Sequence, residues 1–140
     1  MIEPVPAPIE APKIWLPLFA NPAACGFPSP ATDYIEKRLD LNQMCIRNPT
    51  ATYYARAQGT SMQAHHINDG DILVIDRSLE AKHNSIVVAA IDGEFTVKRL
   101  ITSPTVCLVS GNPDYPPIYL QEGQTLEVFG VVTHVVHSLE

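Results

Sequence analysis

The sequence predicts a mainly β fold, arranged as a barrel or half-barrel, with little helix. Many short apolar, β-prone runs are separated by turn residues, which is typical of small barrels. The dipeptide Asp92-Gly93 lies between two such runs and is typical of a two-residue hairpin turn. Four prolines fall within residues 1–13, which excludes helix there and favours an extended N-terminal arm.

Length and composition restrict the class of protein. The 140 residues suit one domain, 46 % of them are apolar, and the net charge is −6. No run of Lys and Arg is present, so direct, specific DNA binding is not expected. No apolar run approaches a membrane span and no signal peptide is recognisable. Three widely spaced cysteines fit reduced thiols, so we expect a cytoplasmic protein.

The N-terminal quarter contains one candidate strand and one unusual segment. Residues 14–19 are apolar and could form a short strand. Residues 21–30 follow, rich in proline and in small side chains around Cys25 and Gly26. An extended, unpaired stretch that allows close backbone approach at glycine is what a protease cleft accepts, although a plain linker has the same composition.

The next segments predict a short helix and then strands. Residues 34–39 are ambiguous between strand and helix, and Asp40 can cap a short helix with Leu41, Met44 and Cys45 on one face. Asn48-Pro49 would end it. Strands are expected at residues 52–57, 72–75, 86–91, 105–109, 118–120 and 126–136, with a bend or bulge at Gly130.

The hairpin at Asp92-Gly93 fixes the pairing of the two strands that it joins. A type I′ turn pairs Ile91 with Glu94, Ala89 with Thr96, and Val87 with Lys98. Lys98 would then lie on the same face as Thr96 and Leu100, with Phe95 and Val97 on the other face. This apolar setting could remove water from the lysine amine.

A serine and a lysine are the candidate catalytic residues. Ser61 lies in the small-residue turn 59–62, and a serine needs a base beside it to act as a nucleophile. Lys98 can be that base if burial lowers its pKa, and Ser-Lys pairs are a known variant of the catalytic triad. The alternatives are a turn-forming serine and a solvated lysine beside Arg99.

Five histidines do not form a recognisable metal site. They are His65, His66, His83, His134 and His137, without the spacing of zinc ligands. A Ser-His-Asp triad with His65 or His83 is formally possible but has no support from spacing. No phosphate loop or dinucleotide motif is present, so no metal and no cofactor are expected.

With these residues in view, the chain resembles the LexA-type self-cleaving serine peptidases, and among them the UmuD and MucA group. The resemblance spans about residue 16 to residue 137. It rests on ordered segments: residues 24–30, 51–54, Gly59-Thr60-Ser61-Met62 with Asp69-Gly70-Asp71, residues 92–98, and residues 129–134.

The resemblance implies a fold, an activity and a role for each matching residue. The fold would be a LexA/signal-peptidase-like partly open β-barrel. Ser61 would be the nucleophile and Lys98 the general base. The bond cut would be Cys25-Gly26, so that the arm, residues 1–25, leaves a peptidase and polymerase-accessory domain, residues 26–140. Gly59, Thr60 and Ser61 would form the oxyanion region.

The resemblance also implies partners. Cleavage would be promoted by a RecA filament on single-stranded DNA during the SOS response. The shortened product would be a homodimer that joins a UmuC-type Y-family polymerase for translesion synthesis. Cleavage within one protomer and cleavage between protomers are both compatible with the sequence.

The sequence differs from the family pattern in two places, and two alternative functions are compatible with it. Only a short arm precedes the expected cleavage site, whereas LexA has a helix-turn-helix domain there. Residues 63–66, Gln-Ala-His-His, replace the acidic residue and glycine usual after the nucleophile. The alternatives are a non-catalytic module that restrains a polymerase, and a signal-peptidase-like enzyme, which would need a membrane anchor.

Overall fold

The computed structural model describes residues 5–6, 12–19, 23, 25–26 and 35–140. The chain divides into two compact units, one of residues 1–9 and 48–140 and one of residues 10–47. Most of the predicted arm, and most of the predicted small-residue segment, lies outside the described residues.

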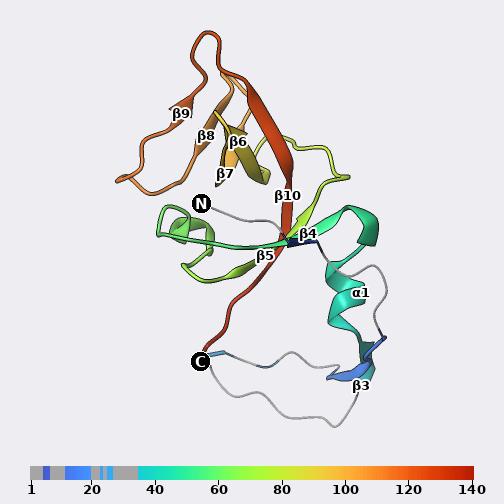
Figure 1. The fold of residues 1–140 in the computed structure, drawn as a ribbon. Helices are drawn as coiled ribbons and strands as arrows, with labels where there is room; N and C mark the ends of the chain where they lie inside the picture. The colour runs from blue at the N-terminus through green and yellow to red at the C-terminus, as the bar shows by residue number, and fades with distance from the viewer. Residues whose placement is uncertain (1–4, 7–11, 20–22, 24, 27–34) are drawn as a thin grey trace. The chain divides into compact units, whose positions relative to one another are not determined.

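The first unit contains an eight-stranded antiparallel sheet with the order β1-β4-β5-β10-β6-β7-β8-β9 (Figure 1). The strands are β1 (Val5–Pro6), β4 (Thr52–Arg56), β5 (Ile72–Asp76), β6 (Ile86–Ile91), β7 (Glu94–Ile101), β8 (Cys107–Val109), β9 (Ile118–Tyr119) and β10 (Leu126–Val136). The sheet does not close on itself, since β1 and β9 are its two edges. The prediction of a mainly β, partly open barrel-like fold is confirmed.

Strand β10 joins the two halves of this sheet. Its first half pairs with β6 and its second half pairs with β5, and the strand runs between the two groups in Figure 1. The register shifts between Val128 and Gly130, as the sequence predicted, and shifts again before His134. A Cβ at Gly130 would lie 2.7 Å from Ile75 Cγ2 and 3.1 Å from the Asp76 carbonyl oxygen, so the bulge has room only for glycine.

The predicted hairpin is confirmed in full. Strands β6 and β7 pair Ile91 with Glu94, Ala89 with Thr96, and Val87 with Lys98. Asp92 and Gly93 have φ values of 52° and 82°, as a type I′ turn requires. Sequence alone therefore set which face of β7 carries Lys98.

Two hydrophobic clusters hold the first unit together. The larger includes residues of the loop that follows β4. Its members are Ala55, Ala57, Met62, Ile67, Leu73, Ile75, Val88 and Val97. The smaller contains Val87, Ala89, Leu100 and Leu108. Val97 and Leu100, on opposite faces of β7, belong to different clusters, so β7 is covered on both sides.

The second unit contains β2 (Leu16–Phe19) paired with β3 (Ile35–Leu39), and the helix α1 (Leu41–Cys45). The strand expected within residues 14–19 is confirmed, and residues 35–39 are strand rather than helix. Asp40 caps α1 through a 2.9 Å bond from the Asn42 amide to its Oδ1, as predicted. Among the apolar side chains of α1, Leu41 and Met44 are exposed and Cys45 is half-buried.

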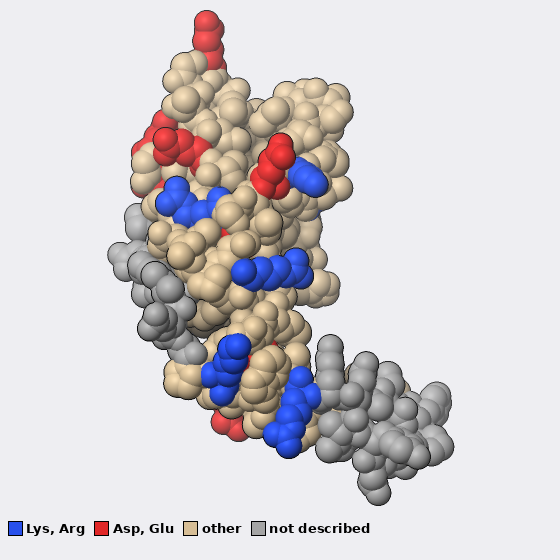
Figure 2. Space-filling model, turned by 90° about the vertical axis from the view of Figure 1, so that its right-hand side faces the viewer, with Lys and Arg blue, Asp and Glu red and all other residues tan. Residues whose placement is uncertain are grey.

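Two further observations concern the helices and the charged side chains. Among the described residues, no helix is long and apolar enough to cross a membrane. On the face shown in Figure 2, Lys and Arg side chains (blue) lie in several small groups, one of them beside Asp or Glu atoms (red).

Candidate active site

Ser61 lies on the loop between β4 and β5, residues 57–71. Backbone bonds join the two ends of this loop: Ala57 N–H donates to the Asp71 carbonyl and Gly70 N–H donates to the Ala57 carbonyl, both at 2.8 Å. Met62 and Ile67 anchor the loop in the larger hydrophobic cluster, at 4 % and 3 % exposure. The buried Met62, directly after Ser61, therefore fixes the position of the serine on its C-terminal side.

Lys98 reaches Ser61 from β7. Its Nζ donates to Ser61 Oγ at 2.8 Å. The lysine is only 8 % exposed, and its strand partner Val87 is fully buried. Desolvation by burial lowers the pKa of Lys98 below its ordinary value of 10.5. The alternative of a solvated lysine is therefore wrong, and a larger fraction of the amine is neutral than in water.

The curvature of the sheet brings these two residues together. Strands β4 and β7 are separated by β5, β10 and β6. In a flat sheet, four strand spacings would place β4 and β7 roughly 19 Å apart. The loop after β4 nevertheless contacts β7, because the sheet curls around the larger hydrophobic cluster, which both strands line.

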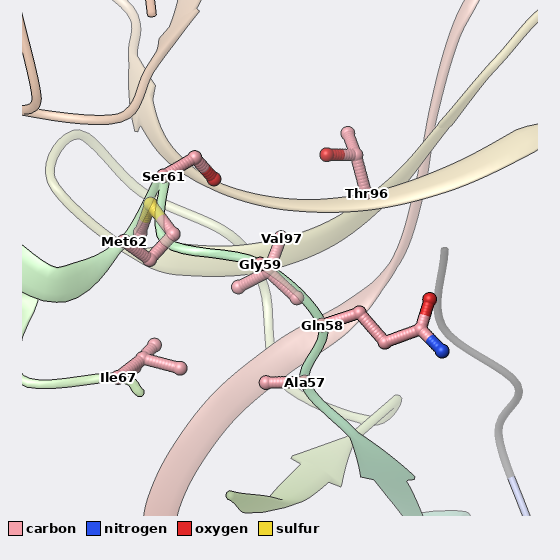
Figure 3. A pocket seen from close by; sticks show the side chains of 8 residues that line it. All are labelled: Ala57, Gln58, Gly59, Ser61, Met62, Ile67, Thr96 and Val97. Atoms are coloured by element: carbon pink, nitrogen blue, oxygen red, sulfur yellow. The ribbon is translucent and has the colours of Figure 1, made fainter. Parts of the chain in front are cut away.

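A small pocket opens beside Ser61. It is lined by Ala57, Gln58, Gly59, Ser61, Met62, Ile67, Thr96 and Val97 and has a volume of about 40 Å³. Figure 3 shows the loop from Ala57 to Met62 along one side and Thr96 of β7 across from Ser61. The volume holds roughly three water molecules, so the pocket accepts only a small side chain.

The amides before and at Ser61 differ in their availability. Gly59 N–H donates to Asp69 Oδ1 at 2.8 Å, so it is already engaged. The amides of Thr60 and Ser61 donate to no acceptor within the described parts of the chain. Of the predicted oxyanion region, these two amides are the ones free to bind a developing negative charge.

A second loop, Ser110–Tyr115, contacts the serine loop and was not predicted. Asn112 Nδ2 donates to the Thr60 carbonyl at 3.5 Å, and the Tyr115 and Thr60 hydroxyls are 3.4 Å apart. Ser110, only 2 % exposed, ties this loop together through bonds with Asn112 and Tyr115. No motif within residues 110–115 indicated that this loop contacts the serine loop.

The histidines take no part in the contact between Ser61 and Lys98. His83 Nδ1 accepts the Thr102 amide, and His65 Nε2 is buried against Gly111. Across the described residues, no group of His, Cys, Asp and Glu could hold a metal ion.

Cys25 and Gly26 belong to the second unit, and both are exposed. A Cβ at Gly26 would meet nothing within 4 Å. The structure thus brings together Ser61, Lys98 and the Gly59–Ser61 turn within the first unit, whereas the predicted cleavage bond belongs to the second unit.

Comparison with known proteins shows the family of the chain. Residues 17–133, which include Ser61 and Lys98, match the Peptidase S24-like family. The chain belongs to the peptidase S24-like family. Protein MucA of Escherichia coli is 48 % identical over 120 residues, 85 % of this chain and 82 % of MucA. Protein ImpA of Shigella flexneri is 50 % identical over 123 residues, 86 % of this chain and 83 % of ImpA.

A more distant peptidase S24-like relative is a LexA repressor of Azoarcus sp. strain BH72. It is 35 % identical over 130 residues, 91 % of this chain and 63 % of the repressor. The resemblance to UmuD- and MucA-like proteins that the sequence motifs indicated is confirmed. Membership and these relatives support an SOS-related self-cleaving peptidase.

Proposed function

We propose that the chain is a serine endopeptidase that cuts its own Cys25-Gly26 bond with Ser61 as nucleophile and Lys98 as general base. The observation that carries the proposal is the 2.8 Å contact between a buried lysine amine and a serine hydroxyl. A nucleophile and base within hydrogen-bond reach, with the base partly neutral, meet the geometric requirement for covalent catalysis.

These positions suit the following reaction. Neutral Lys98 takes the proton of Ser61 as Oγ attacks the Cys25 carbonyl carbon. The Thr60 and Ser61 amides stabilise the oxyanion, and the lysine returns the proton to the Gly26 nitrogen as the peptide bond breaks. Water then hydrolyses the acyl-enzyme. The small pocket beside Ser61 suits a side chain as small as that of Cys25.

The family resemblance supports a proposal for the biological setting. A RecA filament on single-stranded DNA would promote cleavage, and residues 1–25 would be removed. Residues 26–140 would then act as a homodimer and accessory subunit of a UmuC-type Y-family translesion polymerase in the cytoplasm. The relatives MucA, ImpA and the LexA repressor support this assignment.

Intact-mass analysis at pH 7 and pH 10 tests the proposal. Wild-type protein is expected to yield a fragment that begins at Gly26, faster at pH 10 because more of Lys98 is neutral there. Ser61→Ala and Lys98→Ala should yield none. Glu80→Ala, which changes an exposed carboxylate outside the site, is the control and should cut at the wild-type rate.

The contrary result is equally clear. If wild-type protein gives no fragment at either pH, nor with an activated RecA filament, the peptidase proposal fails. The chain would then be a non-catalytic module that restrains a polymerase.

A further inference from the structure

The carboxylate of Asp69 contacts the backbone that leads into Ser61. Its Oδ1 accepts the Gly59 amide at 2.8 Å, across ten residues of sequence. Gly59 has a φ of +88°, a left-handed conformation that the chain needs in order to turn toward Ser61. Without an acceptor, this amide would have to find water at the mouth of the site.

Asp69 is itself held on rigid backbone. The next residue, Gly70, donates to the Ala57 carbonyl at 2.8 Å, and Arg56 Nη1 donates to the Gly70 carbonyl at 3.2 Å. Asp71 accepts the Asn68 amide through Oδ2 at 2.8 Å. The turn that carries Asp69 is thus fixed to the end of β4 and to its own backbone.

Thr60 is the residue between this bond and the nucleophile. Its carbonyl accepts the Gln63 amide at 3.2 Å, which sets the direction of the Thr60–Ser61 peptide. The Gly59 bond fixes the preceding turn. Together they determine where Ser61 Oγ and the two free amides point.

We propose that Asp69 is a positioning residue for self-cleavage. By fixing the Gly59 turn, it holds Ser61 Oγ within reach of Lys98 Nζ and aims the Thr60 and Ser61 amides at the oxyanion. Its role is to accept a hydrogen bond at one point in space, and its negative charge is not required. The inference rests on the proposed peptidase function.

Three substitutions at Asp69 test separately the need for an acceptor, for its position and for a negative charge. Asp69→Asn keeps an acceptor oxygen at the same place and removes the charge, so the cleavage rate is expected to stay within about threefold of wild type. Asp69→Ala removes the acceptor, and Asp69→Glu moves it by one methylene. For both, a loss of about 10- to 100-fold is expected, because a misplacement near 1 Å can cost that much.

The pH dependence distinguishes positioning from general loosening. Asp69→Glu should lower the rate at every pH and leave the midpoint of the rate–pH profile unchanged, because Lys98 stays buried. A loosened fold would hydrate Lys98 and move the midpoint upward. Thermal unfolding of each variant in a Ser61→Ala background shows whether it folds. If Asp69→Ala does not fold, the cleavage rates of Asp69→Asn and Asp69→Glu still test the positioning role.

The outcomes are distinct. If the wild type cuts itself and both Asp69→Glu and Asp69→Ala cut at the same rate, the positioning role is overturned. The peptidase function is then still supported. The positioning role is also overturned if the cleavage rate falls in Asp69→Asn but not in Asp69→Glu, because the site would then require the negative charge. A wild type that never cuts overturns the peptidase function and this inference with it.

Discussion

The burial of Lys98 has two opposing effects, one on its pKa and one on the stability of the protein. Its burial lowers its pKa and so supplies a neutral amine for Ser61, but the same burial penalises the folded protein whenever the amine is charged. Because the folded-state pKa lies below the ordinary 10.5, the unfolded chain binds more protons between the two values. Stability contributed by this residue therefore rises as pH rises through that window.

Replacing Lys98 by a neutral side chain of similar length should stabilise the protein. In a Ser61→Ala background, Lys98→Met is expected to increase the free energy of unfolding at pH 7 by on the order of 1 kcal/mol. The gain should shrink toward pH 10. Urea unfolding at both pH values measures it, and a Met variant less stable at pH 7 would mean that the site does not penalise the charged amine.

Within the site, sequence reasoning succeeded where the signal was local. The hairpin dipeptide fixed the register of β7 and hence the face of Lys98. The contact of the Ser110–Tyr115 loop with Thr60 could not be predicted, because it joins positions 52 residues apart and depends on how the sheet curls.

Strand β10 shows which properties of an element the sequence pattern can predict and which it cannot. Its bounds, Leu126–Val136, and its irregularity at Gly130 were both predicted, because an apolar run interrupted by glycine is a local signal. Its central place between β5 and β6 was not predicted, since strand order is set by long-range packing. The same holds for β1, whose Val5 and Pro6 gave no strand signal but pair with β4.

A single methyl group at the β10 bulge should be costly. In Gly130→Ala, the new Cβ would press on Ile75, which has no exposed surface, and on the Asp76 carbonyl oxygen. We expect a loss of about 1–3 kcal/mol in the free energy of unfolding, measured in urea. Glu127→Ala, at an exposed position of the same strand, should change it by less than about 0.5 kcal/mol. Equal values for the two variants would contradict the tight packing described at the bulge.

At the scale of the whole first unit, one side-chain pair links the end of β10 to the serine loop. His137 Nδ1 lies 2.5 Å from Asp71 Oδ1, and Asp71 is 2 % exposed. Desolvation raises the pKa of Asp71, but the bonds from Asn68 and His137 outweigh it, and the pKa falls below its ordinary 3.8. A depressed carboxyl pKa contributes stability above 3.8 that is lost as pH falls through the folded-state value.

Removing the histidine should weaken this pair only modestly, because His137 is 47 % exposed and solvent screens it. His137→Ala is expected to lose about 0.5–1 kcal/mol of unfolding free energy at pH 6. The difference from wild type should disappear once Asp71 is protonated at low pH. Urea unfolding at pH 6 and at a series of pH values below 3.8 measures this, with Ser138→Ala as the control. A difference that does not shrink as the pH falls through this series would show that the histidine acts by packing instead.

The central place of β10 also sets an order of events during synthesis. Ser61 and Lys98 are both synthesised before β10, the strand that lies between their two halves of the sheet. A nascent chain that still lacks residues 126–136 cannot complete the sheet, and so cannot bring the lysine to the serine. For the catalytic pair proposed above, synthesis of residues 126–136 is therefore the step after which the lysine can reach the serine and cleavage can begin.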